Sequence, residues 1–162
     1  MSLTYILNQI TENIFIGNSH AALHSRDLLK SWGITAVLNV AKDLDNNKLD
    51  PQEFSLNKIG LGDGDGNNLE DIGTALQVLQ NLLSEGHKVL VHCHEGKSRS
   101  VGLVATYIHL KLPEQFKTLD EAEEYIRERR PIAKINAGLK QDYQKIIDLL
   151  SGEVNKFVEE LK

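Results

Sequence analysis

A short polar loop between two apolar segments limits the folds open to this chain. Residues 88–92, KVLVH, form an apolar run too brief for a helix and indicate a buried strand. Residues 99–111 are apolar around most of a helical circumference, which is typical of a central buried helix. The loop between them, which contains Cys93, therefore leaves the carboxyl end of a strand and enters the first turn of a helix. In open α/β sheets, ligands bind at this kind of position.

Strands and helices alternate along the rest of the chain. A hairpin or edge pair is expected around residues 11–13, and further strands at 34–40 and 55–61. Helices are expected at 21–32 (ending at Gly33), from the Asn68 cap to Gly86, from the Thr118–Glu121 capping box to Pro131, and at 139–150. We therefore predict a single α/β domain over residues 1–162, with its core at about 3–150, a C-terminal helical tail at 151–162, and helices on both faces of a sheet.

The composition excludes several classes of function. The formal net charge of −5 argues against broad nucleic-acid binding. No segment is apolar and long enough to span a bilayer, and the first residues lack the pattern of a signal peptide. The single cysteine excludes an internal disulfide, which agrees with a reducing compartment. We expect a cytoplasmic monomer without nucleic-acid or membrane partners.

The loop around Cys93 has the composition of an anion site. The N-terminus of the following helix presents unpaired N–H groups and a partial positive charge. Gly96 permits the turn that curls successive N–H groups inward, and Arg99 offers a planar fork for two phosphate oxygens. These surroundings stabilise a thiolate, so Cys93 is a candidate nucleophile for attack on phosphorus. We expect His92 to orient the loop and Ser100 to donate its hydroxyl to the sulfur.

The stretch VHCHEGKSRS resembles the signature of the cysteine-based protein tyrosine phosphatases, HCxxGxxR followed by Ser or Thr, and is closest to the dual-specificity form HCxxGxSRS. ITENIFIGN, WGITAVLNV and RRPIAKINAGL are similar to other segments of that family. The resemblance implies a central mixed sheet of about five strands, Cys93 as nucleophile, Arg99 as phosphate clamp and Ser100 as thiolate partner. It also implies that the phosphate is held at His94, Glu95, Gly96, Lys97, Ser98 and Arg99, without metal or cofactor.

A proton donor is expected some thirty residues before the cysteine, by the same resemblance. Asp63 directly follows the strand at 55–61, and Asp65 stands two residues later. We favour Asp63, with Asp65 as the alternative, and the flanking glycines would let the loop move. A plain solvated turn in which neither aspartate is catalytic is the other alternative. The spacing of these residues also imitates the start of an EF-hand. Asn68 and Thr74 occupy the places of its glycine and its final glutamate, however, so calcium is disfavoured.

The resemblance makes phosphotyrosine, phosphoserine or phosphothreonine in a protein the expected substrate. Lys97 and Glu95 depart from the common family pattern. A lysine at the position of Lys97 also occurs in phosphoinositide phosphatases. The alternatives are therefore a phosphatase of phosphoinositides and a non-catalytic phosphopeptide-binding module. An arsenate reductase would need further cysteines, and a sulfur-transfer enzyme would not need the upstream aspartate.

Two further groups of charged or titratable residues could bind a ligand. His20 and His24 share a helix face, but no third ligand accompanies them, so we expect surface histidines rather than a metal site. The basic cluster Arg127, Arg129, Arg130 and Lys134 could attract an acidic substrate. We favour the alternative in which these charges complement a helix end and meet solvent.

Overall fold

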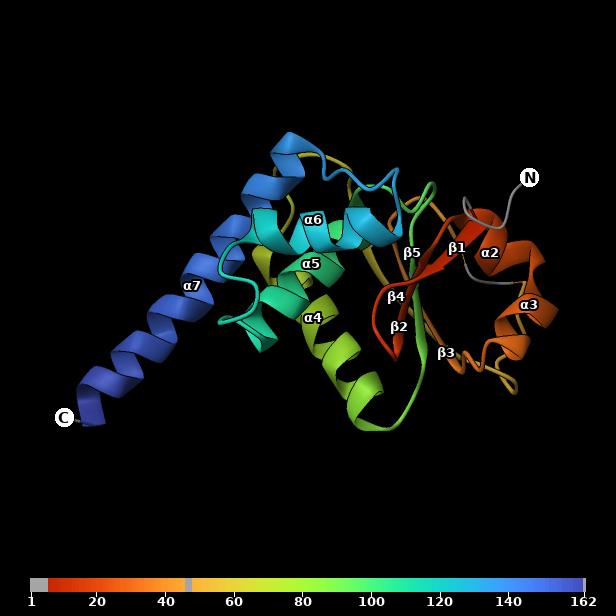
Figure 1. Ribbon diagram of the computed structural model, residues 1–162, viewed down its shortest axis with the longest axis horizontal. Coiled ribbons are helices and arrows are strands. Elements are labelled where there is room, and N and C mark those ends of the chain that lie inside the picture. The colour runs from red at the N-terminus through yellow and green to blue at the C-terminus, as the bar shows by residue number, and fades with distance from the viewer. Residues whose placement is uncertain (1–5, 46–47, 162) are drawn as a thin grey trace.

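The computed structural model describes residues 6–45 and 48–161, with the side chains of 153–161 left aside. Its centre is a sheet of five strands in the order β1-β2-β5-β3-β4 (Figure 1). The pair β1–β2 is antiparallel, whereas β2, β5, β3 and β4 run parallel, so the sheet is mixed as expected. The strands are β1 (Leu7–Gln9), β2 (Ile14–Gly17), β3 (Ala36–Ala41), β4 (Ser55–Leu61) and β5 (Val89–His92).

Strand β5 lies in the middle of the sheet because its apolar residues are buried on both faces. β2 pairs with one side of it and β3 with the other, so that Gly17 and Asn39 both lie opposite His92. Parallel strands end at the same edge of a sheet. The segments that follow β2 and β3 therefore flank the segment that follows β5, which begins with Cys93.

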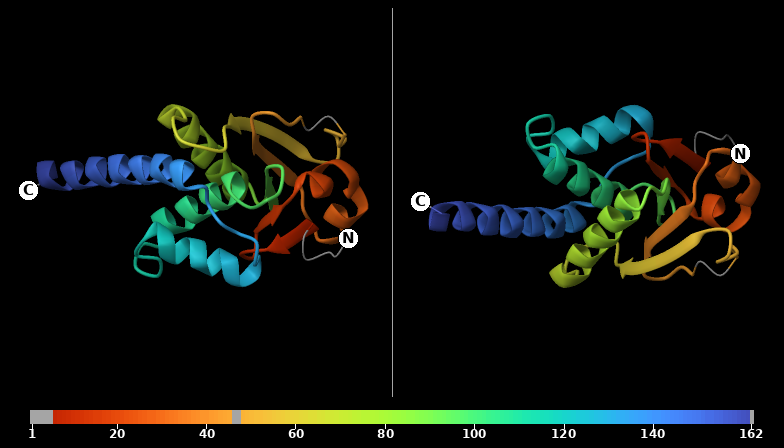
Figure 2. Two further views of the ribbon diagram at one scale, coloured as in Figure 1. Left: turned by 90° about the horizontal axis from the view of Figure 1, so that it is seen from above. Right: turned by 90° about the horizontal axis from the view of Figure 1, so that it is seen from below.

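Helices cover both faces of the sheet, as the sequence predicted (Figures 1 and 2). One apolar cluster packs the sheet against α2 and α3, and a larger one packs it against α4, α5, α6 and α7. The helices are α2 (Ser19–His24), α3 (Arg26–Ser31), α4 (Leu69–Ser84), α5 (Arg99–Lys111), α6 (Leu119–Arg129) and α7 (Ala137–Leu161).

The helix expected at residues 21–32 is broken into α2 and α3. Ser25 lies between them with non-helical backbone angles, φ −127° and ψ 37°. Its hydroxyl donates a hydrogen bond to the His20 carbonyl at 3.3 Å, and such local bonds of serine compete with the helical ladder. The expected end at Gly33 is confirmed, because this glycine has a positive φ of 77°.

The other boundaries follow capping residues that the sequence shows. The side chain of Asn68 accepts a hydrogen bond from the Glu70 N–H at the start of α4, and that of Thr118 accepts one from the Glu121 N–H at the start of α6. Helix α7 continues beyond the body of the domain in Figure 1. Among the described residues, no helix combines the length and the hydropathy needed to cross a bilayer.

Candidate active site

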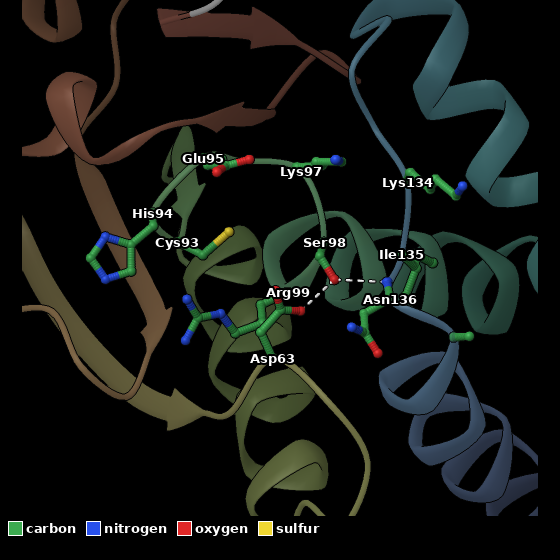
Figure 3. Close-up of a pocket in the computed structure, with 11 residues that line it drawn as sticks. Asp63, Cys93, His94, Glu95, Lys97, Ser98, Arg99, Lys134, Ile135 and Asn136 are labelled. Carbon is green, nitrogen blue, oxygen red and sulfur yellow. Dashed lines mark hydrogen bonds between the residues drawn. The ribbon is translucent and has the colours of Figure 1, made fainter.

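The loop after β5 forms one wall of a pocket of about 610 Å³ at the carboxyl edge of the sheet (Figure 3). The other walls come from the loop after β4 and from the segment between α6 and α7, which adjoins the loop after β5. The lining residues are Asp63, Cys93, His94, Glu95, Lys97, Ser98, Arg99, Lys134, Ile135, Asn136 and Ala137. The structure thus brings the expected nucleophile, clamp and acid together at one site.

The carbonyl groups of residues 94–99 all accept hydrogen bonds from the protein around the loop, at 2.6 to 2.9 Å. Their donors are the Ser19 N–H for His94, the Arg130 guanidinium for Glu95 and Gly96, the Lys134 N–H for Lys97, the Gly102 N–H for Ser98, and the Tyr143 hydroxyl for Arg99. Because carbonyl and amide of a peptide point in opposite directions, this outward anchoring leaves the amides for the pocket.

None of the N–H groups of residues 94–98 donates a hydrogen bond to any part of the chain that the structure describes. Gly96 has a positive φ of 66°, as required to curl these amides into a nest. A Cβ at this position would come within 2.4 Å of the Gly17 carbonyl oxygen and 2.6 Å of the Arg130 guanidinium. The loop is therefore built around a glycine for both conformational and steric reasons.

Arg130 corrects the expectation that the basic cluster after α6 meets solvent. Its side chain is fully buried, and it also donates to the Asn8 side chain at 2.7 Å. Burial lowers the pKa of Arg130 to about 10. Arg130 thus holds the loop at residues 94–99, the anion loop, from the side of its carbonyl groups. Its position at a helix end did not reveal this role. Arg129, by contrast, lies over the Tyr125 ring at the surface.

Cys93 and Ser100 lie together beneath the loop, with Sγ and Oγ 3.2 Å apart. The cysteine is 3% exposed and the serine fully buried. His92 is buried behind them, and its Nδ1 lies 3.3 Å from the Cys93 carbonyl oxygen. Desolvation lowers the pKa of His92 to about 4, so its ring is neutral at physiological pH.

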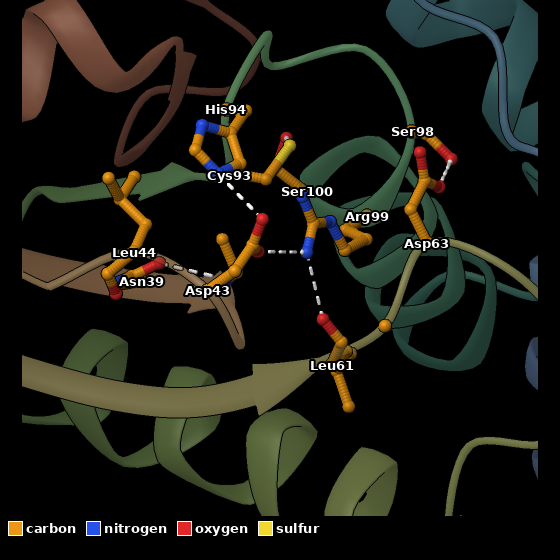
Figure 4. Close-up of polar contacts among 12 residues, drawn as sticks. Asn39, Asp43, Leu44, Leu61, Asp63, Cys93, His94, Ser98, Arg99 and Ser100 are labelled. Atoms are coloured by element: carbon orange, nitrogen blue, oxygen red, sulfur yellow. Dashed lines mark hydrogen bonds and ion pairs between the residues drawn. The ribbon is translucent and has the colours of Figure 1, made fainter.

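Arg99 is almost buried and pairs with a carboxylate that the sequence did not single out (Figure 4). Its Nη1 donates to Asp43 at 2.9 Å and to the Leu61 carbonyl at 3.0 Å. His94 Nε2 lies 2.9 Å from the other oxygen of Asp43. The hydrogen bond from Arg99 lowers the pKa of Asp43 to about 2. Asp43 is therefore a permanent anion that holds the guanidinium beside Cys93.

The signal that could have found Asp43 is its place in the topology. It follows β3, the neighbour of β5, although the polar composition of residues 42–52 indicates only a loop. Asn39, a polar residue within the apolar run of β3, is fully buried. Its amide donates to the Leu44 carbonyl at 2.5 Å and its oxygen accepts from the Ala41 N–H at 2.8 Å. These bonds shape the turn that carries Asp43 to the pocket.

Asp63 lies across the pocket mouth and accepts a hydrogen bond of 2.7 Å from the Ser98 hydroxyl (Figures 3 and 4). That hydroxyl in turn accepts from the Asn136 N–H at 2.8 Å, so its proton points to Asp63. Asp65 is exposed and does not line the pocket. The geometry therefore places Asp63, rather than Asp65, at the pocket that contains Cys93.

The loop that carries Asp63 is anchored through a buried carboxylate. Asp142 on α7 is 1% exposed and accepts hydrogen bonds from the N–H groups of Gly66 and Asn67 at 3.3 and 2.9 Å. The Asn67 side chain also binds the backbone of Gly62 and Gly64. This anchoring was not foreseen, because Asp142 lies in a later helix with no motif around it.

The other metal and ligand alternatives gain no support from the geometry. The rings of His20 and His24 lie 5.2 Å apart at the surface. Over residues 6–45 and 48–161, no three His, Cys, Asp or Glu side chains are grouped as metal ligands.

A ring of free amides above a buried thiol, with a guanidinium alongside, is suited to holding an oxyanion against a sulfur nucleophile, as in the cysteine-based phosphatases. The comparison with known families gives the same class. The model of the dual specificity phosphatase catalytic domain matches residues 14–145, and the chain belongs to this family.

Curated relatives and solved structures agree with this assignment. The chain is 32% identical over 136 residues to dual specificity protein phosphatase 1 of Arabidopsis thaliana, covering 83% of this chain and 66% of that protein. It is 31% identical over 143 residues to human protein phosphatase Slingshot homolog 2, covering 86% of this chain and 10% of that protein. The chain thus corresponds to only part of each relative.

Among solved structures, the Yvh1 phosphatase domain from Chaetomium thermophilum has a TM-score of 0.76 at 28% identity, over 88% of this chain and 96% of that one. The human tyrosine phosphatase-like serine/threonine/tyrosine-interacting protein also has a TM-score of 0.76, at 26% identity, over 90% of this chain and 98% of that one.

Proposed function

We propose that this chain hydrolyses phosphomonoesters of tyrosine, serine or threonine in proteins through a cysteinyl-phosphate intermediate. The observation that carries the proposal is the loop at residues 94–99, whose carbonyls are all bound from outside while the amides of 94–98 stay free above the Cys93 sulfur. Family membership and the two curated phosphatases support the same function.

In the first step, the Cys93 thiolate attacks the phosphorus of the bound phosphoryl group. The free amides and the Arg99 guanidinium carry the charge of its oxygens, as positioning and electrostatics dominate phosphoryl transfer. The bond from phosphorus to the ester oxygen breaks, and Asp63 protonates that oxygen as it leaves. The pairing of Arg99 with Asp43 holds the guanidinium in place before substrate arrives.

In the second step, water attacks the phosphorus of cysteinyl-phosphate. Asp63, now a carboxylate, accepts a proton from this water, and the bond from sulfur to phosphorus breaks. The Ser100 hydroxyl, 3.2 Å from Sγ, donates to the departing thiolate. Inorganic phosphate is released and the enzyme returns to its starting state.

We also infer that the protein acts in the cytoplasm as a monomer. A catalytic thiolate must stay reduced, and Cys93 is the single cysteine of the sequence. Its location in the cell and its mass in solution are open to direct measurement.

Hydrolysis of an aryl phosphate tests the proposed function. We expect the wild-type protein to release p-nitrophenol from p-nitrophenyl phosphate, and Cys93→Ser to lose more than about 10³-fold in kcat because the hydroxyl is a weak nucleophile. The variant should keep the wild-type melting temperature and still bind a phosphotyrosyl peptide. Unchanged turnover in Cys93→Ser contradicts the mechanism. A wild-type protein that binds the peptide without hydrolysing any phosphomonoester is instead a binding module.

A further inference from the structure

Two lysines from distant parts of the chain lie side by side at the pocket mouth. Lys97 belongs to the anion loop and Lys134 to the segment between α6 and α7. The Lys134 N–H donates to the Lys97 carbonyl at 2.8 Å, which ties the two backbones together. Both side chains are exposed and line the pocket. In Figure 3 they lie on the side of the 133–137 segment, away from His94.

Among the cationic side chains around the pocket, these two lysines differ from Arg99 and His94 in having no carboxylate partner. Arg99 and His94 both bind Asp43, and Asp63 is engaged by the Ser98 hydroxyl. Within the described part of the chain, neither ammonium group of Lys97 and Lys134 has a carboxylate within 4.0 Å. The side of the pocket where the two segments meet, the lysine wall, therefore carries two positive charges that have no carboxylate partner.

From this arrangement we infer a second anion subsite, formed by Lys97 and Lys134, next to the phosphate pocket. It binds a carboxylate or a second phosphate that lies beside the phosphorylated residue of a protein substrate. The inference rests on the proposed function and adds the class of substrate: phosphoproteins with an acidic side chain or second phosphoresidue close to the one that is hydrolysed.

The distribution of charge favours a peptide over a phosphoinositide headgroup. A headgroup carries phosphates around one small ring and needs cations on several sides of the pocket. Here Glu95, exposed on the rim, has no cationic partner among the described residues. Its carboxylate repels a compact polyanion. An extended peptide can place its second anion against the lysine wall alone.

Two phosphotyrosyl peptides test the subsite. They share one sequence except that the residues flanking phosphotyrosine are glutamate in one and glutamine in the other. We expect wild-type kcat/KM to favour the glutamate peptide by about 3- to 10-fold, the range of two exposed ion pairs, and this ratio to shrink at high salt. In Lys97→Met/Lys134→Met the ratio should fall to about one. The matched control Lys145→Met removes an exposed lysine on α7 outside the pocket and should keep the wild-type ratio.

The inference is overturned if the wild type turns over both peptides equally or if the double variant keeps the wild-type ratio. It is also overturned if Lys145→Met lowers the ratio as much as the double variant does. A short-chain phosphoinositide whose turnover depends on the two lysines, while the peptide ratio does not, also overturns it in favour of a lipid substrate. Hydrolysis of p-nitrophenyl phosphate by the wild type separates these results from a failure of the proposed function, since that compound carries no second anion.

Discussion

Asp63 lines the pocket and Asp43 contacts two residues that line it, Arg99 and His94, yet the surroundings of the two carboxylates assign them different tasks. Asp43 binds a guanidinium, and its pKa of about 2 keeps it ionised. Asp63 instead accepts from a neutral hydroxyl, that of Ser98, and has no cationic partner in the described residues. Pairs of carboxylates with such unlike environments divide electrostatic and acid–base roles between them. The sequence alone placed an aspartate near the leaving group but did not reveal its counterpart in the turn after β3.

This division predicts different effects for neighbouring aspartates. We expect Asp63→Asn to lower kcat for a phosphotyrosyl peptide by about 10²-fold, because the leaving phenoxide loses its proton donor. Asp65→Asn, which alters an exposed side chain outside the pocket, should stay within about twofold of wild type. Steady-state kinetics at neutral pH measure both. A large loss of kcat in Asp65→Asn, together with a normal kcat in Asp63→Asn, would assign the role of the acid to Asp65.

The buried ring of His92 predicts an acid-sensitive fold. Its pKa is about 4 in the folded chain against the ordinary value of 6.5, so between these pH values the unfolded chain binds a proton that the folded chain does not. The free energy of unfolding should therefore fall by up to about 3 kcal/mol as the pH drops from 6.5 to 4. Urea denaturation at pH 7 and pH 5 should show a smaller fall for His92→Asn. Equal falls in both proteins would refute this account.

The anion loop depends on close contact with β2. Gly17 ends that strand, and Gly96 packs against its carbonyl with no room for a side chain. We expect Gly96→Ala to lower kcat/KM for aryl phosphate by at least about 10-fold and to destabilise the fold by about 1–2 kcal/mol, because alanine strains a positive φ. Gly86→Ala is a matched control, since Gly86 also has a positive φ but no atom near its Cβ position. It should lose stability without losing activity.

The first half of helix α7 packs on the core. Among its residues 137–152, whose burial is described, the buried ones are Leu139, Asp142, Tyr143, Ile146 and Ile147. A chain that ends after residue 151 should therefore keep its aryl phosphatase activity and melt within about 4 °C of the full chain, a difference of about 1 kcal/mol. Circular dichroism and a kinetic assay would show this. Loss of activity would place functional contacts in the segment 152–162.

For the molecule as a whole, local patterns predicted the alternation of strands and helices, the presence of helices on both faces of the sheet, and the loop around Cys93. These features depend on hydrophobic periodicity and on residues close in sequence. Contacts between distant segments were beyond such patterns: Asp43 with Arg99, Arg130 with the loop carbonyls, and Asp142 with the Asp63 loop. Each needs the order of strands and the path of α6 and α7, which no short motif encodes.

The outward anchoring of the loop carbonyls joins segments that are far apart in the sequence. Apart from Gly102 in α5, its donors come from the start of α2, the segment after α6 and helix α7, so the cradle exists only when all of these are docked together. The affinity of the loop for an oxyanion therefore depends on the folding of the whole domain rather than on one local turn. A split or nicked chain whose pieces fail to reassociate would bind no vanadate or tungstate, and either anion should protect the intact protein against heat.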